Sequence, residues 1–307
     1  MEQRIRDRYS EEILAEARNR FAIAPDAIAA LDGFESFIYE FSRDDGAYVL
    51  RIGHTLRRSE DQIRGEVDWI NYLAAGGAGV AQAISSVRGT LVESIDDGRG
   101  GAFLATAFVR ATGGSSWRVE WTPEFIEGYG REIGRVHRLS RSYQPERPLR
   151  PTWDDESNDS MQYIPAEDRL IAAYFERTLS HLRSLARTPD AYGLIHQDAH
   201  GGNFFVDDDG RITLFDFDDC VYGHFVYDIA MVIFYAAANT PDPAAHATDF
   251  FPHFWRGYRQ EYNLDPVWLN EIPWVLKLRE IDLYAVIHRS FDVDAISDSW
   301  ADRFMQG

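Results

Sequence analysis

Residues 194–220 decide the fold, and they read LIHQDAHGGNFFVDDDGRITLFDFDDC. A short apolar run comes first, and it leads directly into the triplet His196-Gln197-Asp198. Asn203 follows Asp198 by five residues. The segment after Asn203 determines how close these polar side chains come to others further along the chain.

That segment has the pattern of a β-hairpin. Residues 204–206 and 211–215 are mainly apolar, as expected of two short strands. The Asp-Asp-Asp-Gly turn at 207–210 joins them, because Asp tolerates left-handed backbone and Gly favours it. The hairpin therefore brings Asn203 and Asp216 to the same end, with Asp198 on the loop that leads into it.

This arrangement suits chemistry on a phosphate. Mg²⁺ prefers oxygen ligands and is usually held by one or two carboxylates together with substrate phosphates. Asn203 and Asp216 can supply protein oxygens, which leaves Asp198 to orient a substrate hydroxyl and accept its proton. The alternative is an acidic hairpin whose turn is solvated or resembles a calcium loop.

The motifs His-Gln-Asp-x-His-x-x-Asn (196–203) and Asp-Phe-Asp (216–218) resemble those of the aminoglycoside phosphotransferase family, which belongs to the protein-kinase-like superfamily. The resemblance extends over residues 28–291 and is strongest over 194–230. It implies a two-lobed α+β fold with an antiparallel sheet and one helix in the N-terminal lobe and a mostly helical C-terminal lobe. It also implies that ATP or GTP binds with Mg²⁺ in the cleft between the lobes.

The same resemblance assigns roles to individual residues. Asp198 and His196 are the catalytic residues, with Asp198 as the proton acceptor and His196 in support of its loop. Asn203 and Asp216 hold magnesium, and His200 gives structural support. The reaction is transfer of the γ-phosphoryl group to a hydroxyl, mostly by positioning and electrostatics.

Composition narrows the class of protein. The chain has 307 residues and a net charge of −19, which disfavours a nucleic-acid partner, since binding to phosphates needs basic surfaces. The charge suits either a cationic substrate or simple solubility. No stretch approaches 18 apolar residues, and the charged N-terminus predicts a helix over 9–21 rather than a signal peptide. A single cysteine, Cys220, fits a cytoplasmic protein without disulfides.

The N-terminal part of the sequence has the pattern expected of the nucleotide-binding lobe. Strands are expected at 28–31, 37–41, 48–52, 80–86, 91–95 and 102–109. Gly33 and Ser36 belong to a turn between the first two strands, which is either an ordinary hairpin turn or the turn that covers the phosphates in the family. We expect Phe108 and Val109, in a hinge at 106–110, to bind the base through their backbone.

Arg51 stands where the family has lysine or arginine on the third strand. Lys277 is the only lysine in the chain, so no lysine serves the N-terminal part. Residues 59–75 predict a helix that opens with a Ser-x-x-Gln capping box. Glu66 lies at the edge of its apolar stripe and is the expected partner of Arg51, with Glu60 as the alternative.

The sequence predicts that the N-terminal lobe covers residues 1–109 and the C-terminal lobe covers residues 110–307. Helices are expected from Thr122, over 166–187, from 227 to about 238, over 248–262 and over 267–291, with loops at 144–165 and 222–225. We interpret Asp228 in two compatible ways: as the aspartate that braces the catalytic loop in the family, and as a negative charge at the start of a helix.

The acceptor is the least determined part of the prediction. Asp219, Glu280 and Asp282, with the acidic segment 154–159, are expected to face the acceptor and favour an amino-bearing molecule. A small hydroxylated molecule (an aminoglycoside, amino alcohol, homoserine-like compound or sugar) is the first choice, a protein serine or threonine the second, and a nucleotide-binding pseudokinase the third. The sequence leaves the oligomeric state open.

Overall fold

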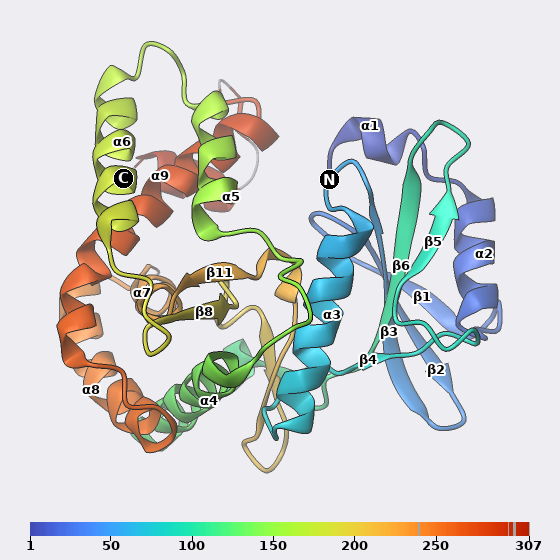
Figure 1. The fold of residues 1–307 in the computed structure, drawn as a ribbon, viewed down its shortest axis with the longest axis horizontal. Coiled ribbons are helices and arrows are strands. Elements are labelled where there is room, and N and C mark those ends of the chain that lie inside the picture. Colours follow the sequence, from blue (N-terminus) through green and yellow to red (C-terminus); the bar gives the residue numbers. More distant parts are fainter. Residues whose placement is uncertain (239, 294, 297–298, 307) are drawn as a thin grey trace.

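The structure is a computed structural model, and it describes residues 1–238, 240–293, 295–296 and 299–306. Figure 1 shows two lobes side by side, one built on a sheet and one mostly helical. The predicted two-lobed α+β fold is thus confirmed. The sheet lobe contains α1 (Gln3–Arg6), α2 (Glu11–Arg20), β1 (Ile28–Leu31), β2 (Phe37–Arg43), β3 (Gly46–His54), α3 (Glu60–Ala75), β4 (Ala83–Ile84), β5 (Glu93–Asp96) and β6 (Ala102–Val109).

The sheet is antiparallel, with strand order β1-β2-β3-β6-β4, and β5 also pairs with β6. Helix α2 covers the outer face of the sheet, while α3 lies between the sheet and the helical lobe (Figure 1). Ser59 and Gln62 form the predicted capping box at the start of α3. The expected strand 80–86 is shorter than predicted, because Val80 instead bridges to Leu214 of the other lobe.

The helical lobe follows β6. Its elements are β7 (Gly114–Ser115), η1 (Ser116–Arg118), α4 (Pro123–Ser142), α5 (Trp153–Ser160), η2 (Met161–Tyr163), α6 (Arg169–Ser184), β8 (Tyr192–Ile195), β9 (Phe204–Val206), β10 (Ile212–Leu214), η3 (Phe217–Asp219), β11 (Val221–His224), α7 (Val226–Ala237), α8 (Pro243–Glu261), η4 (Pro266–Glu271), α9 (Ile272–Ser290) and α10 (Ser299–Gln306).

The predicted hairpin is present: β9 pairs with β10, and Phe204 lies opposite Leu214. Two other predictions for this lobe are wrong. The expected loop at 144–165 contains α5 and η2, and the expected loop at 222–225 is mostly β11, which pairs with β8. In both places packing against the rest of the lobe supplies partners that the local sequence does not show.

The helical lobe has a rigid base where α4 crosses α8. Gly130 on α4 and Gly257 on α8 lie so close to the opposite backbone that an added Cβ would collide with the carbonyl oxygens of Phe254 and Glu127. Glycine is needed at both positions because no side chain fits between the two helices. This base supports α7 and the loop between β8 and β9.

Candidate active site

The loop between β8 and β9 is held from below by Asp228, which is fully buried at the start of α7. Its carboxylate accepts hydrogen bonds from the backbone N–H groups of His196 (3.0 Å) and Gln197 (2.8 Å). His137 of α4 approaches the same carboxylate at 3.1 Å. Gln197 has a φ of 69°, an unusual value for a non-glycine residue, and these bonds hold it there. The predicted brace is confirmed.

His196 lies beneath this loop and not in the cleft. Its side chain is buried, its Nε2 is 3.1 Å from the carbonyl oxygen of Phe215, and its ring packs on Phe217. This places His196 between the loop and the end of the hairpin. It therefore positions other residues, which agrees with the expected support of the loop.

Asp198 lies at the surface of the cleft and is held on both oxygens. Arg279 of α9 donates to Oδ1 at 2.6 Å, while Asn203 Nδ2 lies 3.1 Å and His200 Nε2 3.4 Å from Oδ2. Burial acts to raise the pKa of Asp198, but the charge of Arg279 and the contact with His200 outweigh it and hold the pKa below its ordinary value. Asp198 is therefore a fixed carboxylate anion facing the cleft.

Asn203 and Asp216 meet at the end of the hairpin, as predicted. The amide nitrogen of Asn203 also donates to the backbone carbonyl of Asp198 (2.9 Å), so its amide oxygen is the side-chain atom available to a cation. Asp216 has a left-handed φ of 64° and an exposed side chain. Partial desolvation, followed by repulsion from Asp219, raises the pKa of Asp216.

These two residues fit a divalent cation with oxygen ligands. Within the described part of the chain the Asp216 carboxylate has no hydrogen bond or ion pair. A positive ion beside it would stabilise its charged form and lower its pKa toward the ordinary value. No three His, Cys, Asp or Glu side chains of the described residues gather as a metal cluster. An ion at Asn203 and Asp216 would thus need further oxygens from water or a bound phosphate, as is usual for Mg²⁺.

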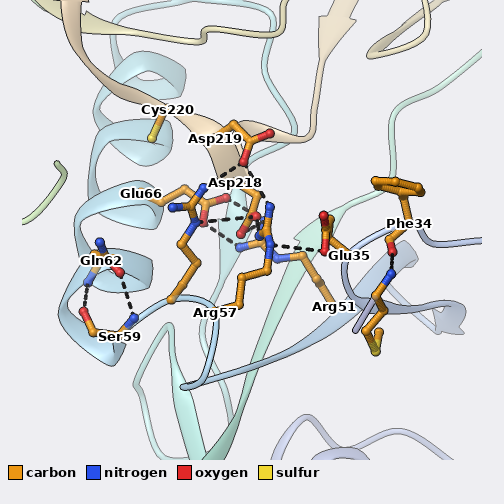
Figure 2. Close-up of polar contacts among 12 residues, drawn as sticks. Phe34, Glu35, Arg51, Arg57, Ser59, Gln62, Glu66, Asp218, Asp219 and Cys220 are labelled. Carbon is orange, nitrogen blue, oxygen red and sulfur yellow. Dashed lines mark hydrogen bonds and ion pairs between the residues drawn. The ribbon is translucent and has the colours of Figure 1, made fainter. Parts of the chain in front are cut away.

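The predicted pair of Arg51 and Glu66 is confirmed as a buried, two-bond contact between β3 and α3. Each guanidinium Nη lies 2.7 Å from one oxygen of Glu66. Arg51 also lies 3.8 Å from Asp218 and over the ring of Phe108. Figure 2 shows Arg51 and Glu66 beside Asp218, at the boundary of the two lobes.

The remaining predicted nucleotide residues lie near Arg51. Ser36 lines a small pocket with Arg51, and Gly33 comes so close to the carbonyl of Ser36 that a side chain at Gly33 would collide with it. The backbone N–H of Val109 donates to Gln82 (2.8 Å) and is thus already used within the lobe. A contact from the backbone of Val109 to a base would therefore use its carbonyl group.

A cavity of about 1840 Å³ opens beside Asp198. Aromatic side chains form much of its wall, namely Phe34, Trp117, Trp121, Tyr163, Tyr235 and Phe250. Asp219 and Asp282 also line it, as predicted. The cavity is large enough for a molecule of several rings and presents both apolar and charged groups to it.

Two predictions about this cavity are wrong. Glu280 pairs with Lys277 on the exposed side of α9 and does not line the cavity, because residue 279 takes the position that faces it. Asp154 pairs with Arg183 and Arg187 away from the cavity. For residues 156–159 only the helical backbone of α5 is described.

Sequence reasoning also missed several cleft residues. Arg279 and Tyr235 come from α9 and α7, and Tyr235 OH accepts from Arg279 Nε at 3.1 Å. Arg57 and Arg58, between β3 and α3, bind the carboxylates of Asp218 and Asp219. The paired arginines in the sequence were a usable signal for the second group, whereas nothing near Arg279 marks it.

Comparisons with known proteins agree with this geometry. The family model described as "Phosphotransferase enzyme family" matches residues 27–264. Amicoumacin kinase of Bacillus subtilis (strain 168) is 37% identical over 297 residues, which cover 94% of this chain and 88% of that protein.

Solved structures extend the comparison. Amicoumacin kinase hAmiN, solved in complex with AMP-PNP, Ca²⁺ and Ami, superposes with a TM-score of 0.93 at 34% identity, covering 100% of this chain and 95% of that chain. A microcompartment-associated aminopropanol kinase has a TM-score of 0.78 at 21% identity, with 97% and 94% covered. The spectinomycin phosphotransferase APH(9)-Ia has a TM-score of 0.64 at 13% identity, with the same coverage. These last two similarities concern the fold.

Proposed function

The chain belongs to the phosphotransferase enzyme family and is a small-molecule phosphotransferase, and on this premise we propose that it transfers the γ-phosphoryl group of ATP to a hydroxyl of amicoumacin or a closely similar compound. The observation that carries the proposal is the placement of Asp198. Its carboxylate faces the large cavity on one side and contacts Asn203, at the end of the hairpin, on the other.

The nucleotide side of the site supports ATP with a divalent cation. The similar kinase hAmiN was solved with AMP-PNP and Ca²⁺. In this chain Asn203 and Asp216 would hold the cation, which would neutralise phosphate charge. Arg51, fixed by Glu66, would contact the phosphates, and the turn with Gly33 and Ser36 would lie over them.

On the acceptor side, the hydroxyl of the acceptor would lie against Asp198. The hydroxyl oxygen of the acceptor forms a bond to the γ-phosphorus while the bond from that phosphorus to the β–γ bridging oxygen breaks. The hydroxyl proton passes to the carboxylate of Asp198, and ADP leaves with the bridging oxygen. Arg279 holds Asp198 ionised and oriented for this transfer.

The acceptor cavity favours a partly aromatic acceptor over a small sugar. Trp117 and Phe34 line it and remain 70% and 57% exposed, so apolar groups of a ligand would cover surface that now faces water. Asp282 offers a carboxylate in the same cavity. An amphipathic, amino-bearing molecule fits both features.

The test compares Asp198→Asn with Asp216→Ala, using ATP, Mg²⁺ and amicoumacin. Asp198→Asn should keep nucleotide affinity and lower kcat by on the order of 10²-fold or more, the scale of general-base catalysis. Asp216→Ala should lose Mg²⁺-dependent stabilisation by ATP. Asp208→Asn, in the exposed turn of the same hairpin, is the matched control and should behave as wild type.

Two outcomes would count against the proposal. Wild-type kcat in Asp198→Asn would remove Asp198 as the proton acceptor. Nucleotide binding without phosphorylation of amicoumacin would point to another acceptor, and a panel that includes protein substrates and GTP as donor would then identify the pair. A wild-type protein that phosphorylates nothing in that panel would instead be a nucleotide-binding protein without transfer activity.

We also propose that the lobes divide at 109 and 110 and that the enzyme acts in the cytoplasm. Across the described residues no helix is both long and apolar enough to cross a bilayer. Cys220, the single cysteine, is buried, and its pKa is raised by burial. Its thiol is therefore inert, which suits a role in packing.

A further inference from the structure

Arg150 is a buried arginine in the segment between α4 and α5, and it lines neither the cavity beside Asp198 nor the small pocket beside Ser36. Its Nε donates to the backbone carbonyl of Cys220 and its Nη2 to that of Asp218, both over 2.7 Å. Its third nitrogen, Nη1, donates to the backbone carbonyl of Gln62 over 3.1 Å. One guanidinium therefore joins two segments that lie far apart in the sequence.

The first of these segments begins with Asp216, whose backbone is left-handed with a φ of 64°. Such a conformation costs energy in a residue other than glycine and persists only where the surrounding contacts fix it. Before Asp216, the N–H of Phe215 donates to the carbonyl of Asn203 over 2.9 Å. After Asp216, the two bonds from Arg150 hold η3 and the residue that follows it. The direction of the Asp216 side chain depends on both sets of bonds.

The third bond ties this turn to α3. Gln62 lies in the first turn of α3, and Glu66 follows one turn later on the same helix. Glu66 in turn holds Arg51, the residue that would contact the phosphates. Arg150 thus connects the helix behind the expected phosphate contact with the turn that carries the expected cation ligand.

Resting on the proposed function, we propose that Arg150 is a positioning residue for the divalent cation: its three bonds hold Asp216 where the carboxylate binds the cation that accompanies ATP. Arg150 itself touches neither the cation nor the nucleotide. Mg²⁺ demands near-ideal octahedral geometry, so it tolerates little displacement of a ligand. A guanidinium suits this task because its planar set of donors reaches carbonyls on two segments at once, whereas an ammonium is a single point of charge.

The competing explanation is that Arg150 only stabilises the fold, since its hydrogen bonds contribute to stability in either case. The two explanations differ in what they predict for the cation. A positioning role raises the Mg²⁺ concentration that ATP binding requires. A purely structural role lowers the free energy of unfolding and leaves that Mg²⁺ concentration unchanged.

The experiment uses the full chain with Arg150→Gln and Arg150→Lys. Arg135→Gln is the matched control, because Arg135 of α4 also joins separate segments, through Glu261 of α8 (2.7 Å) and the carbonyl of Gly77 after α3 (3.3 Å). Arg135 lines neither of the two cleft cavities. The measurements are the Mg²⁺ dependence of thermal stabilisation by ATP, the ATP affinity in the presence of a chelator, and the free energy of unfolding in urea.

Arg150→Gln should raise the Mg²⁺ concentration for half-maximal stabilisation by ATP by on the order of 10-fold or more, the scale found for groups that orient a metal ligand. The ATP affinity without a divalent cation should change less than about twofold, because the phosphate contacts remain. Arg150→Lys should show a smaller rise, since lysine keeps the charge but not the planar set of donors. Arg135→Gln should lose stability and keep the wild-type Mg²⁺ requirement.

The inference is overturned if Arg150→Gln keeps the wild-type Mg²⁺ requirement, or if its ATP affinity weakens equally with and without the cation. If Arg150→Gln does not fold, Arg150→Lys decides: a rise of about threefold or more in the Mg²⁺ requirement supports the inference, and a smaller one overturns it.

These measurements need no acceptor, so they test Arg150 even if amicoumacin is the wrong acceptor. A wild-type protein without Mg²⁺-dependent stabilisation by ATP would instead overturn the proposed function, and this inference with it.

Discussion

Arg279 donates a hydrogen bond from Nη2 to Oδ1 of Asp198 over 2.6 Å, although 81 residues separate them. The guanidinium is held in turn by the hydroxyl of Tyr235, and it lies 5.3 Å from the centre of that ring. His200 also packs on the Tyr235 ring, with 4.4 Å between the ring centres. Helices α7 and α9 thus determine the direction in which the carboxylate of Asp198 points.

The first prediction concerns this contact. Arg279→Gln should lower kcat by roughly 10- to 100-fold, because Asp198 loses its orientation while the nucleotide side is untouched. Arg279→Lys should recover part of the loss in kcat, since lysine keeps the positive charge but lacks the planar set of N–H donors of arginine. Steady-state kinetics and Mg²⁺–ATP stabilisation measure the two effects separately.

Lys277→Ala is the matched control, because Lys277 lies on the same helix and faces solvent. Equal losses in Arg279→Gln and Lys277→Ala would mean that the helix, and not the contact with Asp198, is responsible. Weakened ATP binding in Arg279→Gln would place Arg279 on the nucleotide side instead.

The second prediction concerns Arg51. Arg51→Ala leaves Glu66 buried without its partner, which should destabilise the fold by about 3–5 kcal/mol and weaken ATP binding. Arg51→Met combined with Glu66→Leu should regain most of the stability but not the ATP affinity. Denaturant unfolding and nucleotide titration of the single and double variants measure this. Full recovery of ATP affinity in the double variant would show that Arg51 serves stability alone.

The third prediction concerns Asp228, the brace beneath the loop that carries Asp198. Asp228→Ala leaves the buried N–H groups of His196 and Gln197 without acceptors and should lower the free energy of unfolding by about 3 kcal/mol. The kcat should fall even where the variant is fully folded, because Asp198 directly follows Gln197 in the loop that Asp228 holds. Urea unfolding together with kcat at a temperature where the variant is folded separates the two. An active variant with normal stability would contradict the brace.

The fourth prediction concerns pH and His224, which is buried against Tyr192 and Trp268. Burial, assisted by the charge of Arg187, lowers its pKa to about 4 from an ordinary 6.5, although the hydrogen bond with the carbonyl of Ala186 and the charges of Glu271 and Asp154 act in the opposite direction. Between these two values the unfolded chain binds a proton that the folded protein does not. Stability should therefore fall as the pH drops from 6.5 to 4, by up to about 3 kcal/mol from this group.

Unfolding free energies at pH 7 and pH 4.5 for the wild type and His224→Gln test this prediction. Whatever the stability of the variant at pH 7, its loss between the two pH values should be smaller by on the order of 2–3 kcal/mol. Carboxylates titrate equally in both proteins, so the difference isolates His224. Identical losses would show that His224 keeps an ordinary pKa in the folded protein.

Local sequence was sufficient wherever the interacting residues are close in the chain or belong to one motif. The capping box at Ser59 and Gln62, the hairpin 204–214 and the pair of Arg51 with Glu66 were all predicted correctly. The first two depend on helix capping and turn chemistry, which the sequence shows directly, whereas the third followed from the resemblance to the kinase-like family. The role of these residues in catalysis remains a proposal.

Predictions failed where partners come from distant segments. Residues 222–224 form a strand because β8 supplies the hydrogen bonds, and a short segment with a glycine does not reveal this by itself. Glu280 was assigned to the cavity one residue away from Arg279, and on a helix one residue turns the side chain by about 100°.

The sequence by itself determined most of the helices and strands, the position of the loop and hairpin, and the identity of Asp198, Asn203 and Asp216 as the polar groups gathered there. Only the tertiary structure decided which charges lie beside Asp198 and beside the carboxylates that follow the hairpin, namely Arg279 from α9 at Asp198 and the pair Arg57 and Arg58 from the other lobe at Asp219. The reason is physical: hydrogen bonds within a turn or cap are set by adjacent dihedral angles, whereas an ion pair between lobes depends on how separate elements pack, and packing is a property of the whole chain.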